Sequence, residues 1–462
     1  MRPVLFAAAL LVALAFAALA GPAPFAVLLF LLAATMLAVL AWRFPVPATL
    51  AWLVLTGTTL EMWLGDLLGL AWYQPLIAIE KGAGLLLALM AVARFGIRAD
   101  WCNPGLAFGA IFAIGLAHGL YPGLTPGESL RSLVGSAAPY AFSFARLSRP
   151  WARAVIRTVA LIPLIDLAGG IVLAAAGLRP LFVSSGGWRL EATSHPAFLG
   201  GFALAAIYAC LIELYREGGR REMALLAANF AILVLSGARA PLLYAGAVTV
   251  LTLGFVPSPA FPRRTRFGLL LAALALAPLA AGLAGSLSSL RLFNLLDHNA
   301  DALSGREALW AYFRRAAATS PWFGWGLGAG NAVIPQTSRV VALMHTWAAH
   351  NEYLRMAVEG GRLGEALLIG AFVLWASAHT APLPRAERAI LRLVFLAFAC
   401  HAVTDNVLIS TSASVLFALV SAVFARGALE AEDAARAAAG RHAPIRRPEV
   451  PSCPSAASSS RS

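Results

Sequence analysis

Long apolar stretches separated by short polar connections run along nearly the whole chain. Each stretch has about 18 or more residues, which is the length a helix needs to cross a membrane. The stretches are continuously apolar rather than alternating, so they do not fit a transmembrane β-barrel. The pattern predicts an all-α, polytopic helical membrane protein with about 12–14 transmembrane helices. The predicted spans cover residues 3–20, 23–42, 46–70, 73–93, 104–121, 128–145, 153–177, 196–215, 222–236, 241–257, 268–287, the helix after residue 350, 389–407 and 409–426.

Composition and charge support this fold class. Of the 462 residues, 60% are hydrophobic and only 12% are charged, which is too apolar for a soluble protein. The net charge of +13 comes from arginines that collect in every second connection between the predicted spans. This is the positive-inside pattern, so the charge reflects topology, and nucleic acid is not expected as a partner.

The alternation of arginine clusters places both termini in the cytoplasm and the long segment 288–349 on the outer side. We therefore predict a transmembrane domain over residues 1–427, with this external loop carrying the site. Residues 428–462 are rich in alanine and arginine and then in proline and serine, which indicates a disordered cytoplasmic tail. Such a tail can touch anionic membrane lipids.

The most informative stretch begins at His350, where the polar segment meets an apolar helix. Asn351 is a good N-cap residue and Glu352 suits a first helical turn, so His350 would lie at the positive end of the helix. Unpaired N–H groups at that end favour anions and a neutral imidazole. Helical spacing continues through Gly361 to Glu365, and the glycines would let another helix approach closely.

Three further polar residues fall on the predicted outer face. Arg239 follows Ser236 and Gly237 between two spans, on the side that positive-inside bias disfavours, so phosphate binding by its planar guanidinium is one explanation and a snorkelling side chain is the other. Arg189 lies in the loop before His195, and His195 precedes a proline that marks the start of a span.

The external segment holds two more patterns. Residues 304–307 have the spacing of a capping box and predict an amphipathic helix from Arg306 to Ala318. The glycine-rich run 324–331 lacks the βαβ context of a dinucleotide-binding motif, and a tight turn on a lipid or sugar is the better interpretation.

Arginines around one histidine suit a diphosphate leaving group and a general base. The alternative is that His350 only caps the helix or donates a hydrogen bond to a phosphate oxygen. No HExxH, Walker or GxSxG motif occurs, and His345 and His350 are spaced so that they diverge on a helix, so no metal site is expected.

These residues resemble the O-antigen ligase and O-antigen polymerase superfamily of bacterial inner-membrane glycan transferases. The resemblance covers roughly residues 185–410 and rests on four motifs in order. They are Ser236-Gly237-Ala238-Arg239, Ser304-Gly305-Arg306 with Trp310, Gly324-Trp325-Gly326-Leu327-Gly328, and His350-Asn351-Glu352-Tyr353-Leu354 with Glu359-Gly360-Gly361 and Gly364.

The resemblance implies a glycosyltransferase of the inner membrane that moves a glycan from undecaprenyl diphosphate to an acceptor hydroxyl on the periplasmic side, without ATP, metal or other cofactor. Arg239, Arg306 and Arg189 would hold the diphosphate, and His350 would activate the acceptor. The acceptor is a lipid A-core sugar for a ligase and the growing glycan for a polymerase. We favour the ligase because one large loop holds the histidine motif and no second one could house a polymer. A transporter of lipid-linked glycans is a further alternative.

Overall fold

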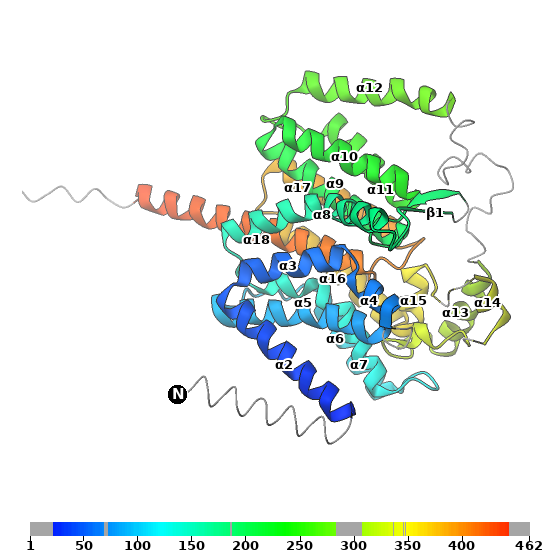
Figure 1. The fold of residues 1–462 in the computed structure, drawn as a ribbon. Coiled ribbons are helices and arrows are strands. Elements are labelled where there is room, and N and C mark those ends of the chain that lie inside the picture. Colours follow the sequence, from blue (N-terminus) through cyan, green and yellow to red (C-terminus); the bar gives the residue numbers. More distant parts are fainter. Residues whose placement is uncertain are drawn as a thin grey trace, which may run out of the picture.

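The computed structural model describes residues 22–68, 73–184, 187–282, 307–335, 337–344, 346 and 348–442. The described residues are almost entirely helical, as the apolar pattern predicted, with one short antiparallel hairpin (Figure 1). Before the hairpin, the elements are α2 (Pro22–Arg43), α3 (Pro45–Gly57), α4 (Leu60–Leu68), α5 (Tyr73–Phe95), α6 (Pro104–His118), α7 (Pro126–Ala137), the 3₁₀ helix η2 (Ala138–Phe144) and α8 (Arg149–Ala175).

The hairpin itself consists of β1 (Phe182–Ser184) and β2 (Trp188–Leu190). The elements that follow are α9 (Pro196–Glu217), α10 (Arg220–Ser236), α11 (Arg239–Phe255), α12 (Arg263–Gly282), α13 (Glu307–Thr319), η4 (Ala329–Asn331), α14 (Arg339–Met344), α15 (Glu352–Glu359), α16 (Gly361–Thr380), α17 (Arg385–His401) and α18 (Thr411–His442).

Five helices of the described part of the chain are long and apolar enough to cross a membrane, and several shorter apolar helices accompany them. Two of the five form the centre of the bundle. The helix α9 is buried along nearly its whole length between α8, α10, α11, α17 and α18. The first half of α18 packs against α8, α3 and η2, where Phe417 and Tyr140 are in ring contact. The protein is therefore a multi-pass membrane protein with its largest core around α9 and α18.

Several connections expected on the outer side lie at one end of this bundle. In Figure 1 the hairpin and the helices α13, α14 and α15 gather at the end opposite to the protruding end of α18. A small second core joins α13, η4 and α15 through Leu309, Phe313, Val333 and Val358. The described residues of the segment 288–349 are thus folded against the other helices rather than extended away from them.

The predicted single helix after His350 is wrong, because it is broken into α15 and α16 at Gly360 and Gly361. The segment 321–326 inserts at the break: Trp325 and Gly326 donate backbone hydrogen bonds to the last carbonyls of α15, and Arg362 and Leu363 donate to the carbonyls of Pro321 and Trp322. A periodic apolar pattern cannot reveal this break, because it continues across it.

Gly361 is required at this break. Its φ of +57° lies in the left-handed region, and a Cβ there would lie 2.5 Å from the carbonyl carbon of Trp322. We expect Gly361→Ala to destabilise the protein by at least about 1–2 kcal/mol, because backbone atoms on both sides must move. Gly370→Ala is the matched control, since a Cβ there meets nothing within 4 Å. Equal melting temperatures of the two variants in detergent would contradict this account.

The predicted disorder from residue 428 is also wrong for residues 428–442, because α18 continues to His442. Its alanine-rich sequence has high helix propensity, and its carboxylates are paired. Asp433 pairs with Arg149, Glu430 pairs with Arg216, and Glu432 pairs with Arg436. The prediction for residues 443–462 lies outside the described residues.

Candidate functional site

The backbone around His350 is held in place through both of its neighbours, Ala349 and Asn351. Asn351 is the N-cap of α15, as predicted, and its side chain accepts a hydrogen bond from the backbone N of Leu354 at 3.0 Å. His350 itself has a φ of +48°, which few residues with a Cβ adopt. Trp310 donates to the carbonyl of Ala349 at 2.8 Å, so α13 holds the residue before it. Such a conformation persists only where the surroundings impose it, and it is typical of functional sites.

Both ring nitrogens of His350 have polar neighbours. The Nδ1 atom lies 3.2 Å from Oδ1 of Asp405, and the Nε2 atom lies 3.4 Å from the hydroxyl oxygen of Thr346. The side chain is 23% exposed, so a ligand can reach it. A carboxylate on Nδ1 fixes that proton and leaves the lone pair of Nε2 to accept another, which is the arrangement that a general base needs.

Asp405 contacts His350 in the structure, although the sequence pattern gave it no role. It lies in the turn 402–410 between α17 and α18, and its Oδ2 is 3.8 Å from Nε2 of His401. Partial burial on its own would raise the pKa of the Asp405 carboxyl, but the hydrogen bond from His350 and the charges of His401 and His350 lower that pKa to about 2. The carboxylate is therefore ionised at neutral pH.

The turn 402–410 also holds Glu352, which the sequence marked as a supporting residue. The backbone N of Glu352 donates to the carbonyl of Ala402, and its Oε1 accepts a hydrogen bond from the backbone N of Leu408, both at 2.8 Å. Glu352 thus ties the start of α15 to both ends of this turn. His350 and Asp405, 55 residues apart in sequence, are held together by these bonds.

A buried ion pair network continues from Glu352 along α15. The Nε atom of Arg355 is 2.5 Å from Oε2 of Glu352, and its Nη1 atom is 2.8 Å from Oε2 of Glu359. Glu359 in turn accepts a hydrogen bond from the backbone N of Gly330 at 3.3 Å. Sequence analysis missed Arg355, although its i+3 and i+4 spacing to the two glutamates was a readable signal.

Two of the predicted arginines meet at the turn between α10 and α11. Arg239 is the first residue of α11, directly after the turn in which Gly237 has a φ of +63°. Arg189 on β2 is buried, and its Nε donates to the carbonyl of Ser236 at 2.9 Å. This hydrogen bond ties Arg189 to the turn that carries Arg239, so Arg189 helps to position that turn.

The helix α11 connects Arg239 with the turn that carries Asp405. Tyr244 lies five residues after Arg239, roughly 7–8 Å along the helix axis. Its ring contacts the ring of His401, with 5.0 Å between centroids, and His401 is the residue beside Asp405. The structure therefore gathers Arg239, Asp405 and His350 at the same end of the bundle.

The other predicted residues are less closely connected to this group. His195 is the N-cap of α9, where its Nδ1 accepts a hydrogen bond from the backbone N of Ala197 at 3.3 Å, and its ring lies against Phe198. This confirms the predicted start of the span at Pro196. Arg306 and His345 lie outside the described residues, as does the predicted capping box at Ser304.

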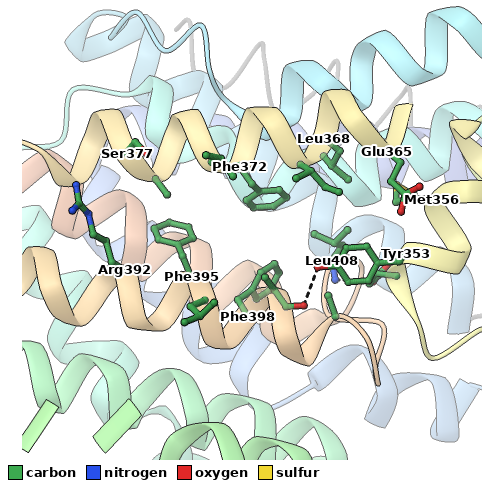
Figure 2. Close-up of a pocket in the computed structure, with 17 residues that line it drawn as sticks. Tyr353, Met356, Glu365, Leu368, Phe372, Ser377, Arg392, Phe395, Phe398 and Leu408 are labelled. Carbon is green, nitrogen blue, oxygen red and sulfur yellow. Dashed lines mark hydrogen bonds between the residues drawn. The ribbon is translucent and has the colours of Figure 1, made fainter. Parts of the chain in front are cut away.

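An apolar cavity of about 350 Å³ opens beside this site, between α16 and α17. Figure 2 shows Leu368, Phe372, Phe395 and Phe398 along its walls, with the hydroxyl of Tyr353 donating to the carbonyl of Ala399. Glu352 and Glu365 are among its lining residues, and Figure 2 shows Glu365 at the same end of the cavity as Tyr353 and Met356. The cavity follows two apolar helices away from the site, and Ile369, Val373 and Leu396 of its lining are exposed on the surface of the bundle.

Comparison with known protein families supports the resemblance. A family model described as O-antigen ligase matches residues 223–369. No curated protein matches the chain. The matched region contains Arg239, α13, the glycine run, His350 and α15, and it ends before Asp405. Residues 223–369 thus match the O-antigen ligase family, which confirms the resemblance to the O-antigen ligase and polymerase superfamily.

Proposed function

We propose that the protein is an O-antigen ligase, which transfers a glycan from undecaprenyl diphosphate to a hydroxyl of a lipid A-core sugar at the periplasmic face of the bacterial inner membrane. The observation that carries the proposal is the pairing of His350 with Asp405 next to a domain of the O-antigen ligase family. A base held by a carboxylate suits the activation of a sugar hydroxyl.

In the proposed reaction, Nε2 of His350 accepts the proton of the acceptor hydroxyl. The hydroxyl oxygen forms a bond to the anomeric carbon of the donor glycan, while the bond from that carbon to the diphosphate oxygen breaks. Arg239 and Arg306 hold the departing diphosphate through paired hydrogen bonds. Asp405 balances the positive charge that His350 gains, and water later takes this proton.

The apolar cavity between α16 and α17 supports a lipid-linked donor. An undecaprenyl chain is a long hydrocarbon, and this cavity is lined mainly by apolar side chains, among them phenylalanine and leucine. It begins at Glu352, whose carboxylate is bonded to the turn that carries Asp405. A chain bound there would bring its diphosphate end towards His350 and Arg239.

Deletion of the gene, followed by analysis of the surface glycan, tests the ligase. Loss of a ligase leaves completed polymer on the lipid carrier and a lipid A-core without glycan. Loss of a polymerase of the same superfamily leaves single repeats attached instead. If single repeats were found on the acceptor, the protein would be a polymerase and not the proposed ligase.

Replacement of Arg239 by lysine tests diphosphate binding. Lysine keeps the positive charge but loses the planar pair of donors, so we expect the kcat/KM for the donor to fall roughly ten- to a hundredfold. Arg306→Lys is expected to behave likewise. Arg385→Lys, at the exposed start of α17, is the matched control. Transfer by Arg239→Lys at the rate of the control would show that Arg239 does not bind the diphosphate.

A further inference from the structure

A second, polar cavity of about 230 Å³ lies between α5, α7, α15 and the turn 402–410. It is lined by three cationic side chains together with hydroxyl and amide groups. These are Lys81, Arg131, Arg355, Ser132, Ser136 and Asn331. Among the described residues of its wall, Glu359 is the only acidic one, and it is paired with Arg355. The described lining of the cavity therefore carries an excess of positive charge.

Lys81 is the most unusual member of this lining, because lysine side chains are rarely buried. It is only 7% exposed, and its Nζ donates to the carbonyl of Ile409 at 2.6 Å. The carboxylates of Glu80, Glu352 and Glu61 attract it electrostatically, and Glu80 also accepts a hydrogen bond from Thr56. An ammonium has three donors, and the hydrogen bond to Ile409 uses one of them.

Arg355 supplies a second unused donor. Its Nε and Nη1 atoms bind Glu352 and Glu359, but its buried Nη2 atom has no hydrogen-bond partner. The neighbouring helix α7 leaves room beside Lys81, since Gly135 has no side chain and a Cβ there would lie 3.7 Å from Nζ. Arg131 and Asn331 are exposed at the mouth of the cavity. Buried donors at the floor and an open mouth are the features of a site for an anion.

The cavity is connected to the catalytic pair but lies on a different side of it from Arg239. Lys81 reaches the turn 402–410 at Ile409 from α5, whereas Tyr244 of α11, the helix that begins at Arg239, contacts His401 just before the same turn. Arg355 in the cavity is bonded to Glu352, which is bonded to Leu408. A group bound in the cavity would therefore approach His350 from the side away from the donor diphosphate.

We propose that this cavity binds an anionic group, a phosphate or a carboxylate, carried by the acceptor glycan. The proposal rests on the proposed function, because it assigns the acceptor to one side of His350 and the diphosphate to the other. A cavity of this size suits one such substituent with part of its sugar, and the hydroxyls of Ser132 and Ser136 can bind the sugar's own hydroxyls.

Binding of inorganic phosphate to the purified, full-length protein tests the anion site itself. We expect Lys81→Met and Arg131→Gln each to weaken phosphate binding about tenfold or more, because each removes a charge-assisted hydrogen bond. Arg385→Gln removes the same charge from an exposed position on α17 and should bind phosphate as the parent does. Arg131 is exposed, so its variant tests the site even if Lys81→Met fails to fold. Unchanged phosphate binding by Arg131→Gln and by a folded Lys81→Met would overturn the proposal.

Transfer kinetics distinguish the acceptor from the donor as the source of the anion. With an acceptor that carries a phosphate or a carboxylate, both variants should raise the KM for the acceptor about tenfold and leave the KM for the donor unchanged. With the same acceptor after removal of that group, variants and parent should have equal KM values. A rise in the donor KM instead would overturn the assignment to the acceptor.

The outcomes also separate this proposal from the proposed function. A parent protein that binds phosphate through Lys81 and Arg131 but transfers no glycan would refute the proposed function and leave the anion site standing. A parent that transfers glycan while both variants keep its KM values would refute the cavity proposal alone.

Discussion

Replacement of His350 by alanine should lower glycan transfer by the purified protein roughly a hundredfold or more, with donor binding largely kept. The variant removes the group that accepts the acceptor proton, and general base catalysis typically contributes at least this factor. The arginines proposed to hold the diphosphate are unchanged, so the loss should fall on kcat rather than on the KM for the donor. His195→Ala, which removes a helix cap near the same end of the bundle, should lose far less activity.

The pH dependence separates a base from a hydrogen-bond donor at this position. If His350 is the base, transfer falls as the pH drops and the imidazole becomes protonated. If a protonated His350 instead donates a hydrogen bond, transfer falls as the pH rises. The lowered pKa of Asp405, about 2, means that this carboxylate is protonated only in strong acid. Its contribution to stability is complete above the usual aspartate pKa of about 3.9 and is lost only as the pH falls through about 2. An acid limb between pH 5 and 8 therefore cannot belong to Asp405.

Asp405→Asn should lower kcat by on the order of a hundredfold, although the side chain keeps its size. An amide cannot balance the charge on a protonated His350, and it no longer selects the tautomer with the proton on Nδ1. We also expect the acid limb of the pH profile to move to lower pH, because the imidazolium loses its anionic partner. The kcat and the pH profile are measured on the same preparation. If the substitution only reduced the fraction of folded protein, kcat would fall but the pH of the acid limb would not change.

A matched control for this variant is available at the other end of the molecule. Asp433→Asn removes a carboxylate from a half-exposed ion pair with Arg149 on the protruding part of α18. Pairs of this kind contribute little to stability, so transfer should be unchanged. Equal activity of Asp405→Asn and Asp433→Asn would mean that Asp405 has no part in the reaction.

Local sequence rules predicted the features that depend on neighbouring residues. Asn351 caps its helix, Pro196 begins α9, and the glycine-rich run forms tight turns in which Gly324, Gly326 and Gly328 have positive φ values. Each depends on one or two residues whose backbone preferences are strong. The apolar pattern also gave the fold class, because helices that cross a membrane must be apolar over their whole length.

The features that were missed depend on contacts between distant segments. The break between α15 and α16 exists because residues 321–326 insert there, and the bond between His350 and Asp405 joins positions 55 residues apart. The prediction that the glycines of this region let another helix approach closely is confirmed at Gly364, where a Cβ would lie 3.0 Å from Ile111 of α6. The ordered continuation of α18 depends on Arg149 and Arg216, which lie far away in the sequence.

The most direct test of the account is transfer in proteoliposomes that contain only the purified protein, its undecaprenyl-diphosphate-linked glycan and a lipid A-core acceptor. The account predicts that the parent protein forms the glycan-acceptor product without ATP or added metal ions, and that His350→Ala forms it at about one hundredth of that rate or less. Product formed equally fast by His350→Ala, or no product from a parent protein that binds the donor, would contradict it.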